Sequence, residues 1–243
     1  MLISFIVPAY DEEVLLGATL ASLLGAARAL GEPFELIVVN DASTDTTARI
    51  ARTHGARVLD VDLHKIGAVR NAGARVASGE LLVFVDADTL VAEPTLRQML
   101  DAIRKRAIGG GSRVRLDLHR VSWWTGALAK ASCWALFRLG FAGGCFVFAR
   151  RDAFDAIGGF DERYFASEEI HLRIALAKRG RFVMLPHAVV SSGRKLRLFS
   201  AAQIARQMLR FCVTGFAMVQ RREGLDLWYD GRREADDFRP PLQ

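Results

Sequence analysis

Short apolar runs alternate with amphipathic segments along the first part of the chain. Runs without polar residues are typical of strands buried on both faces, whereas apolar residues three or four positions apart indicate helices. The pattern predicts strands at 2–8, 35–39, 57–61 and 81–85, with a helix after each of the first three. Because strands and helices alternate, we expect an α/β fold whose mostly parallel sheet carries helices on both faces.

Polar residues indicate where the first predicted helix begins. Asp11 is suited to cap a helix N-terminus, and Glu12 and Glu13 carry charges that favour a first turn. The apolar residues expected on the buried face of this helix are Leu16, Leu20, Leu23, Leu24 and Ala27. The second helix is expected to end near Gly55, and the third to cover residues 66–77.

The second part of the chain alternates less regularly. Its pattern predicts helices at 94–103, 122–139, 151–157 and 168–179, and strands at 109–116, 146–149 and 182–185. A basic, partly amphipathic segment at 193–222 and a charged tail follow.

Three of the predicted strands end in residues that suit a ligand site. These are Pro8-Ala9-Tyr10, Asn40-Asp41 and Asp86-Ala87-Asp88. The carboxyl ends of parallel strands share one edge of a sheet, where α/β proteins bind ligands, so we expect these residues to converge. The two close carboxylates of Asp86 and Asp88 indicate a divalent metal that holds a phosphate; a polar turn after a strand is the alternative interpretation.

Composition narrows the range of partners and compartments. The chain has 243 residues and a net charge of +6, which suits a nucleotide, a phosphorylated lipid or an anionic membrane surface. Nucleic acid is not expected, because the chain has no recognised nucleic-acid-binding motif. Three well-separated cysteines, with no signal peptide and no uncharged run of membrane-spanning length, predict a cytoplasmic protein.

Four segments, taken in order, resemble the inverting glycosyltransferase family 2, which has the GT-A fold. They are residues 5–12 (FIVPAYDE), 38–45 (VVNDASTD), 83–88 (VFVDAD) and 158–162 (GGFDE), the last followed by Glu168-Glu169. The resemblance covers roughly residues 3–190, and the set is much more specific than any one segment. It implies a UDP-, GDP- or dTDP-sugar donor, Mn²⁺ or Mg²⁺, and a hydroxyl acceptor that is a saccharide or lipid-linked.

The resemblance also implies an organisation for the whole chain. A GT-A domain is expected at 1–195, with a nucleotide-binding half at about 1–90 and an acceptor and catalytic half at about 91–195. Residues 196–243 are expected to form a basic amphipathic helix and tail.

By resemblance, individual residues receive roles at the donor. Asp88 is expected to bind the metal directly, and Asp86 to face the ribose and base or the metal's water shell. Asp41 would accept hydrogen bonds from the base, and Arg194 or Lys195 would meet the diphosphate. The residues expected at the nucleotide are Pro8, Ala9, Tyr10, Glu12, Asp41, Arg70, Asp86 and Arg194.

Glu169 is the predicted catalytic base. An inverting transfer needs a carboxylate that takes the proton of the acceptor hydroxyl as its oxygen attacks the anomeric carbon. The family often has Glu-Asp where this chain has Glu168-Glu169, and Glu169 matches the Asp that serves as base. The alternative is that both glutamates only favour a helix N-terminus that Ser167 caps. His187 lies too early to match the family's histidine ligand, so we expect it to be a structural strand-end residue.

Aromatic and basic residues in the second half have two interpretations each. Tryptophans and phenylalanines between 123 and 141 could line an acceptor groove or form a hydrophobic core. The segment 194–222 could pack against the domain or a second subunit, or lie on an anionic membrane. Packing is favoured, and peripheral membrane contact and a homodimer stay open.

Two other functions compete with a transferase. Asp86-Ala87-Asp88-Thr89 also matches the first motif of haloacid-dehalogenase-like phosphatases, in which Asp86 would be the nucleophile. That motif normally opens its domain, whereas three predicted strands precede it here. A catalytically inactive protein that binds a nucleotide sugar is the second alternative.

Overall fold

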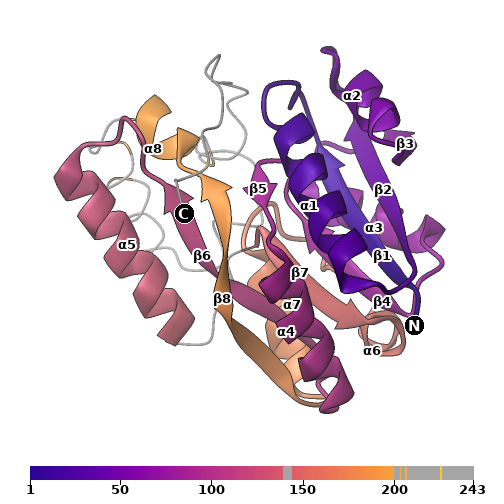
Figure 1. Ribbon diagram of the computed structural model, residues 1–243. Helices are drawn as coiled ribbons and strands as arrows, with labels where there is room; N and C mark the ends of the chain where they lie inside the picture. The colour runs from indigo at the N-terminus through magenta and orange to yellow at the C-terminus, as the bar shows by residue number, and fades with distance from the viewer. Residues whose placement is uncertain (139–143, 200–202, 204–205, 207–224, 226–243) are drawn as a thin grey trace.

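The computed structural model describes residues 1–138, 144–199, 203, 206 and 225 (Figure 1). The strands of this part of the chain are β1 (Ile3–Ala9), β2 (Phe34–Asp41), β3 (Arg57–Val61), β4 (Leu81–Val85), β5 (Thr89–Leu90), β6 (Gly109–Asp117), β7 (Phe146–Arg150) and β8 (Phe182–Ser192). The helices are α1 (Leu16–Leu30), α2 (Thr47–Thr53), α3 (Ile66–Val76), α4 (Glu93–Arg104), α5 (Trp123–Arg138), α6 (Arg151–Ala156), α7 (Glu168–Ala177) and α8 (Arg194–Leu198).

The strands form one sheet in the order β3-β2-β1-β4-β7-β6-β8-β5. The pairs β1–β2, β1–β4, β2–β3 and β6–β8 are parallel, and β7 runs antiparallel to both β4 and β6. The predicted α/β fold is therefore confirmed. Its parallel half comes from the regular first part of the chain, and the antiparallel pairings all involve later strands.

Helices cover the sheet on both faces, as the alternating pattern predicted (Figure 1). Successive residues of β1 belong to different cores: Phe5 packs in the cluster that contains α1 and α4, and Ile6 in the cluster that contains α3 and α7. Every residue of β1 and β4 is buried, which explains why β4 is entirely apolar and why β1 is apolar except for Ser4. In the described part of the chain, no helix is long and apolar enough to cross a membrane.

The first helix begins later than predicted. Asp11 has a left-handed backbone conformation with φ of 47°, and α1 starts only at Leu16. The Asp11 carboxylate accepts a hydrogen bond from the backbone N–H of Thr44 at 2.8 Å, instead of capping α1. The prediction for Asp11 was wrong, because contacts with a loop distant in sequence determine its position.

Ser167 also differs from its predicted role. It precedes α7 as expected, but it has φ of 62° and makes no side-chain capping hydrogen bond. Glu168 and Glu169 do occupy the first turn of α7, where carboxylates favour the positive end of the helix dipole. The helix prediction was thus right, and the cap assignment was wrong.

Close packing at Gly73 holds α3 against the sheet. A Cβ atom added at Gly73 would collide with Cγ2 of Ile6 and would lie 2.8 Å from Cγ2 of Val39. The backbone of α3 therefore lies closer to β1 and β2 than any larger residue would permit. This contact matters for the site, because α3 also carries Arg70.

We predict that Gly73→Ala lowers the free energy of unfolding by about 1–3 kcal/mol, because the added methyl overpacks the α3 contact. The matched control is Gly25→Ala in α1, where an added Cβ would meet no atom within 4 Å. That change should stabilise the protein by about 1 kcal/mol through helix propensity. Urea unfolding of both variants measures the difference, and equal effects would contradict the close packing.

Candidate active site

The predicted convergence at one sheet edge is present in the structure. Because β1, β2 and β4 are parallel, Tyr10, Asp41 and Asp86 all leave the sheet at the same edge. The side chains there form two charged clusters. One is built around Arg70 and the other around Arg194, and the short segment from Asp86 to Asp88 joins them.

Arg70 is the centre of the first cluster. Its side chain is 2% exposed, and Nη2 donates to Oδ1 of Asp86 at 2.6 Å and to the carbonyl oxygen of Gly144 at 2.9 Å. Nη1 donates to Oε1 of Glu168, which is also buried. The guanidinium thus ties the end of β4 to the first turn of α7. The sequence predicted that Arg70 lies beside the nucleotide, and the structure shows it buried beneath two carboxylates.

Glu169 lies next to this cluster. A Cβ atom added at Gly144 would lie 3.2 Å from Cδ of Glu169, so the carboxyl group faces this glycine. The backbone carbonyl oxygen of the next residue, Cys145, accepts a hydrogen bond from the backbone N–H of Asp86 at 3.1 Å. The segment Gly144-Cys145 therefore lies between the predicted base and the first aspartate of the Asp-x-Asp pair.

Burial raises the pKa of Glu169 from 4.5 to about 8, and the negative charge of Glu168 acts in the same direction. Burial also raises the pKa values of Asp86 and Glu168, although the positive charge of Arg70 opposes both shifts. A carboxyl group that titrates near neutral pH is suited to exchange a proton during a reaction.

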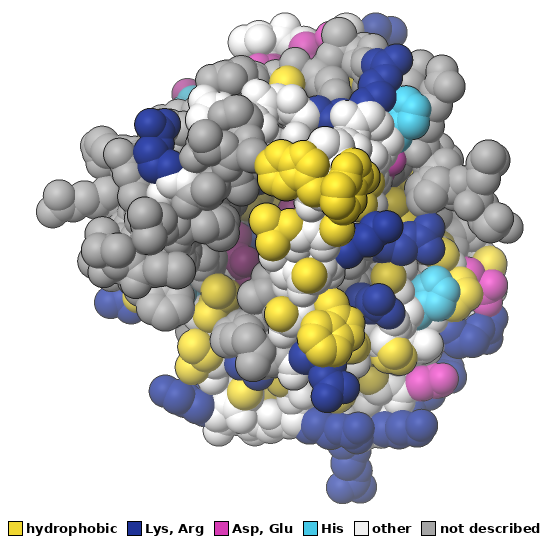
Figure 2. Space-filling view, turned by 90° about the vertical axis from the view of Figure 1, so that its left-hand side faces the viewer, with side chains coloured by type: hydrophobic (Ala, Val, Ile, Leu, Met, Phe, Trp, Pro, Cys, Tyr) yellow, Lys and Arg dark blue, Asp and Glu magenta, His cyan; other side chains and the backbone are white. Residues whose placement is uncertain are grey.

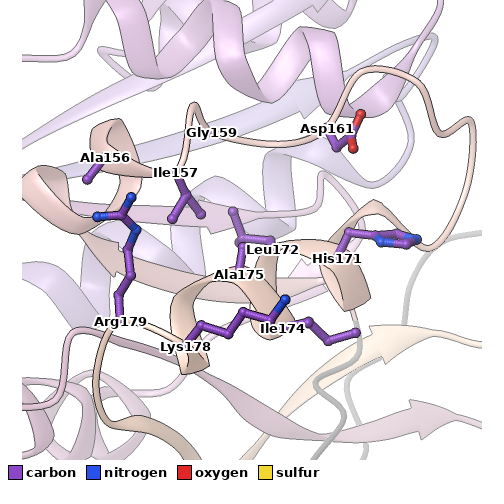
Figure 3. Close-up of a pocket in the computed structure, with 10 residues that line it drawn as sticks. All are labelled: Ala156, Ile157, Gly159, Asp161, His171, Leu172, Ile174, Ala175, Lys178 and Arg179. Carbon is purple, nitrogen blue, oxygen red and sulfur yellow. The ribbon is translucent and has the colours of Figure 1, made fainter.

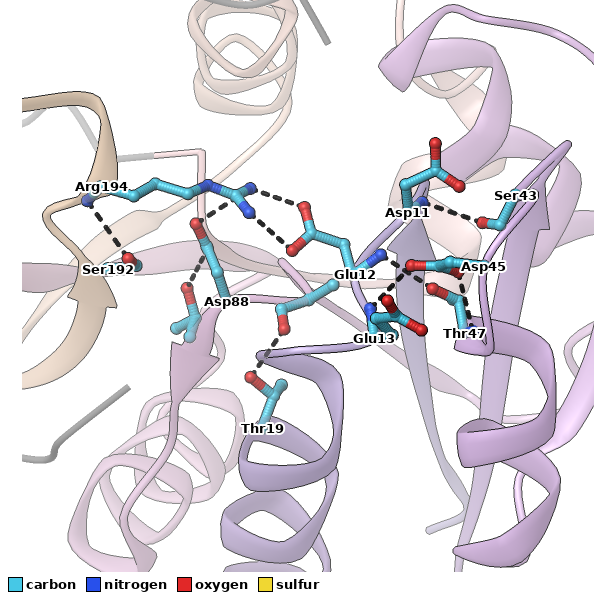
Figure 4. A network of polar contacts seen from close by, with 12 residues as sticks. Asp11, Glu12, Glu13, Thr19, Ser43, Asp45, Thr47, Asp88, Ser192 and Arg194 are labelled. Carbon is cyan, nitrogen blue, oxygen red and sulfur yellow. Dashed lines mark hydrogen bonds and ion pairs between the residues drawn. The ribbon is translucent and has the colours of Figure 1, made fainter. Parts of the chain in front are cut away.

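Arg194 forms the second cluster (Figure 4). Its two terminal nitrogens donate to the two carboxylate oxygens of Glu12, each at 2.6 Å. Nη2 also lies 3.4 Å from Oδ2 of Asp88. Glu12, which was predicted near the ribose, is the partner of Arg194 in this structure. Arg194, which was predicted to meet the diphosphate, thus lies beside Asp88.

The segment before α1 is fixed by the loop that follows β2 (Figure 4). The backbone N–H of Glu12 donates to Oγ1 of Thr47 at 2.8 Å, and that of Glu13 donates to Oδ2 of Asp45 at 3.0 Å. These bonds hold Glu12 at the sheet edge, where its carboxylate reaches Arg194.

Asp41 and Tyr10 lie at the ends of β2 and β1. Oδ1 of Asp41 accepts the backbone N–H groups of Leu63 at 2.7 Å and His64 at 3.2 Å, and Oδ2 takes part in neither bond. Tyr10 is 38% exposed, and its ring meets the ring of His64 edge to face, with the centroids 5.8 Å apart. Pro8 and Ala9 are buried in β1 behind it.

The chemistry of the acidic residues fits a divalent cation that a diphosphate helps to hold. Mg²⁺ and Mn²⁺ prefer oxygen ligands, and Mg²⁺ is often bound by one or two carboxylates with phosphates and water completing the shell. Asp86 and Asp88 supply two such carboxylates. Among the described residues, no group of three or more potential ligands is present.

His187 has the structural role that the sequence predicted. Its Nδ1 lies 2.9 Å from Oγ1 of Thr95, and its backbone N–H donates to Gln98. His171, in α7, stacks on Tyr164 with the ring centroids 3.7 Å apart.

A separate hollow of about 470 Å³ lies against the outer side of α7 (Figure 3). Asp161, His171 and Lys178 are among the residues that line it, and none of the sequence-predicted site residues does. The hollow is therefore not the site predicted from the sequence.

Comparison with known proteins assigns the chain to a family. The sequence model described as Glycosyl transferase family 2 matches residues 4–158, which is more than half of the chain. The chain belongs to this family. A validoxylamine A glucosyltransferase of Streptomyces hygroscopicus subsp. jinggangensis (strain 5008) is 37% identical over 107 residues, covering 42% of this chain and 25% of the relative.

Solved structures confirm the GT-A fold. The mannosyltransferase PcManGT from Pyrobaculum calidifontis, in complex with GDP-Man and Mn²⁺, superposes with a TM-score of 0.67 at 19% identity, covering 90% of this chain and 62% of that one. TarS of S. aureus in complex with UDP-GlcNAc gives a TM-score of 0.62 at 20% identity, covering 94% and 78%. At these identities the likeness concerns the fold.

We predict a pH-dependent stability difference for Glu169→Gln. A raised pKa means that the folded state binds the Glu169 proton more tightly than the unfolded state does. The proton therefore adds to the free energy of unfolding. This gain is complete below about pH 4.5 and is lost as the pH rises through about 8. Near pH 9 the free energy of unfolding of the neutral variant should therefore exceed that of the wild type by about 1 kcal/mol or more. Near pH 5 this gain should be smaller.

Urea unfolding at both pH values measures this difference. Glu80→Gln is the matched control, because Glu80 is an exposed glutamate at the amino end of β4. It should show no pH-dependent change. A Glu169→Gln effect that is the same at both pH values would contradict the half-buried, charge-repelled environment of Glu169.

Proposed function

We propose that this protein transfers a sugar from a nucleoside-diphosphate sugar to an acceptor hydroxyl, with inversion at the anomeric carbon and with Glu169 as general base. The observation that carries the proposal is the position of Glu169, across Gly144-Cys145 from Asp86 at the ligand-binding edge of the sheet. The matches to curated relatives span about a quarter of their length, so the activity is inferred from the site and not transferred from them.

The proposed base has the required chemistry. As the acceptor oxygen attacks the anomeric carbon, its proton passes to a carboxylate oxygen of Glu169, and the bond to the diphosphate breaks on the opposite face. A base is most effective when its pKa is close to the working pH, and the pKa of Glu169 is raised to about 8. Arg70 fixes the neighbouring Glu168 and thereby the first turn of α7.

Positive charge is needed on the leaving-group side, because the departing nucleoside diphosphate gains negative charge. Arg194 supplies a permanent cation beside Asp88. We propose that Asp88, with Asp86 near it, holds Mn²⁺ or Mg²⁺, which when bound stabilises the charge of the diphosphate. When the donor binds, the guanidinium of Arg194 can exchange its partner Glu12 for phosphate oxygens, which it binds in the same two-pronged manner.

The other end of the donor is assigned to β1 and β2. The exposed ring of Tyr10 offers a surface for a base to stack on, and Oδ2 of Asp41 is an acceptor for a base N–H. Pro8 and Ala9 would form the wall behind the base. Uracil, thymine and guanine all present a suitable N–H group, so we propose a UDP-, GDP- or dTDP-sugar.

The acceptor class stays open between a saccharide and a lipid-linked hydroxyl. Curated relatives include the validoxylamine A glucosyltransferase and an undecaprenyl-phosphate 4-deoxy-4-formamido-L-arabinose transferase of Shewanella sediminis (strain HAW-EB3), which is 31% identical over 96 residues.

A phosphatase is less consistent with this site. Asp86 would have to act as a nucleophile, yet its Oδ1 is held by Arg70 at 2.6 Å. The acidic pair that would complete a phosphatase metal site, Asp236-Asp237, lies outside the described residues. Membership of the glycosyltransferase family favours the transferase over this alternative.

We predict that Glu169→Gln lowers the rate of sugar transfer at least about a hundredfold, because general-base catalysis commonly contributes that much. Donor affinity should stay within about twofold, because Glu169 faces the acceptor in this proposal. A screen of UDP-, GDP- and dTDP-sugars with manganese first identifies the donor. Transfer kinetics and calorimetric donor binding are then measured for the variant, with Glu80→Gln as control. Retained transfer would remove Glu169 from its assigned role.

We predict that Asp88→Asn weakens metal-dependent nucleotide binding at least about tenfold, because the amide loses the negative charge that attracts the cation. Thermal shift with UDP, GDP or dTDP, each with and without Mn²⁺, provides the measurement. The control is Asp101→Asn on the exposed face of α4. A Mn²⁺-dependent shift as large as that of the wild type would exclude Asp88 as a metal ligand.

A further inference from the structure

The helix α5 exposes large apolar side chains. The exposed fractions are 85% for Trp123, 49% for Trp124, 63% for Leu128 and 56% for Trp134. The sequence allowed these tryptophans to form a hydrophobic core, and that alternative is wrong. Contiguous apolar surface of this kind on a soluble domain commonly marks a site of interaction.

The helical spacing separates two sides of α5. Gly126, Ala129, Cys133 and Phe137 follow one another at intervals of three or four and are the less exposed side. Trp123 and Trp134 are eleven positions apart, which is about three turns, so they lie on the same side of the helix about 16 Å apart. The helix is therefore apolar on both sides, and among the described residues only one of these sides is packed.

The charged residues of α5 and of the sequence on either side of it are all positive. From Leu118 to Arg151 the sequence contains no Asp or Glu. On α5 itself, the exposed charges are Lys130 and Arg138, and the guanidinium of Arg138 lies 5.7 Å from the ring centroid of Trp134. The neighbouring strand β6 exposes Arg113 and Arg115. Figure 2 shows hydrophobic and basic side chains gathered on this face of the molecule.

We propose that this surface, which we call the α5 face (Trp123, Trp124, Leu128, Lys130, Trp134 and Arg138), docks on an anionic lipid bilayer. Tryptophan prefers the boundary between lipid headgroups and acyl chains, because its ring is apolar and its N–H group is polar. Lysine and arginine beside it attract anionic headgroups. The α5 face combines both features and lies along a single helix, as an in-plane membrane contact requires.

The charge of the face argues against a second copy of this chain as its partner. In a twofold-symmetric dimer each face meets its own equivalent, so Lys130 and Arg138 would approach the same residues of the partner. Like charges that meet across an interface oppose association. A bilayer with anionic headgroups supplies the opposite charge and an apolar layer at the same surface.

Co-sedimentation of the full chain with lipid vesicles tests the proposal. The protein should pellet with vesicles of phosphatidylcholine and phosphatidylglycerol, bind phosphatidylcholine alone more weakly, and be released as salt rises. Trp123→Ser/Trp134→Ser should reduce the partition constant at least about tenfold, because two large apolar side chains no longer enter the interface. Lys130→Glu/Arg138→Glu should abolish the preference for the anionic vesicles.

Matched substitutions on α7 are the controls. Ile174→Ser and Lys178→Glu change an exposed apolar and an exposed basic residue away from the α5 face, and both should leave vesicle binding unchanged. Thermal unfolding of each variant shows that it folds. Wild-type protein that stays in the supernatant at low salt, or a tryptophan variant that pellets like the wild type, would overturn the proposal. A dimer that the tryptophan changes convert to monomer, without vesicle binding, would identify the α5 face as a self-interface instead.

Discussion

A buried guanidinium determines the geometry of this site. Arg70 comes from α3, whose close approach at Gly73 fixes the helix against the sheet, and it bonds to Asp86 at the end of β4 and Glu168 at the start of α7. A protein with a buried ion pair is usually no more stable than one with well-packed apolar residues at the same positions. Removing one partner of the pair, however, leaves an unpaired buried charge and costs about 3–5 kcal/mol. The value of this arrangement is therefore positional. It holds Asp86 and the helical turn that carries Glu169 at a constant separation.

The arginines at the centres of the two charged clusters differ in burial. Arg70 is 2% exposed and Arg194 is 13% exposed, whereas their aspartate partners Asp86 and Asp88 are 32% and 14% exposed. Arg194 also comes from α8, a short helix that follows β8, while Arg70 lies within a longer helix packed on the sheet. A fully buried arginine beside Glu168 and a less buried one beside Asp88 suit the proposed group transfer. The base must be oriented in advance, whereas the cation must exchange a carboxylate for an incoming diphosphate.

The sequence predicted what depends on local pattern and missed what depends on distant pairs. The predicted bounds of β3 and β4 agree with the structure. β4 is a fully apolar run and β3 is a short run between two turns, and both patterns can be recognised from neighbouring residues alone. Asp11 was misassigned because its partner, Thr44, lies in another loop. Arg70 and its partner Glu168 are 98 positions apart in the sequence, and Arg194 and its partner Glu12 are 182 positions apart. No rule based on short sequence spacing finds such pairs. The sequence also did not predict which side of α5 packs against the domain. Apolar residues occur on both sides of this helix, so apolar and polar positions do not alternate with the helical period.

The α5 face and the donor site are connected through one pair of strands. β6 and β8 are parallel, with Asp117 opposite Ser192, so both strands end side by side. After this edge, β6 leads into α5, and β8 leads to Arg194 at Asp88. Asp117 reinforces the connection, because its carboxylate lies 3.7 Å from Nη1 of Arg197 in α8. If α5 lies in a bilayer surface, this strand pair sets the phosphate side of the site at a fixed height above it.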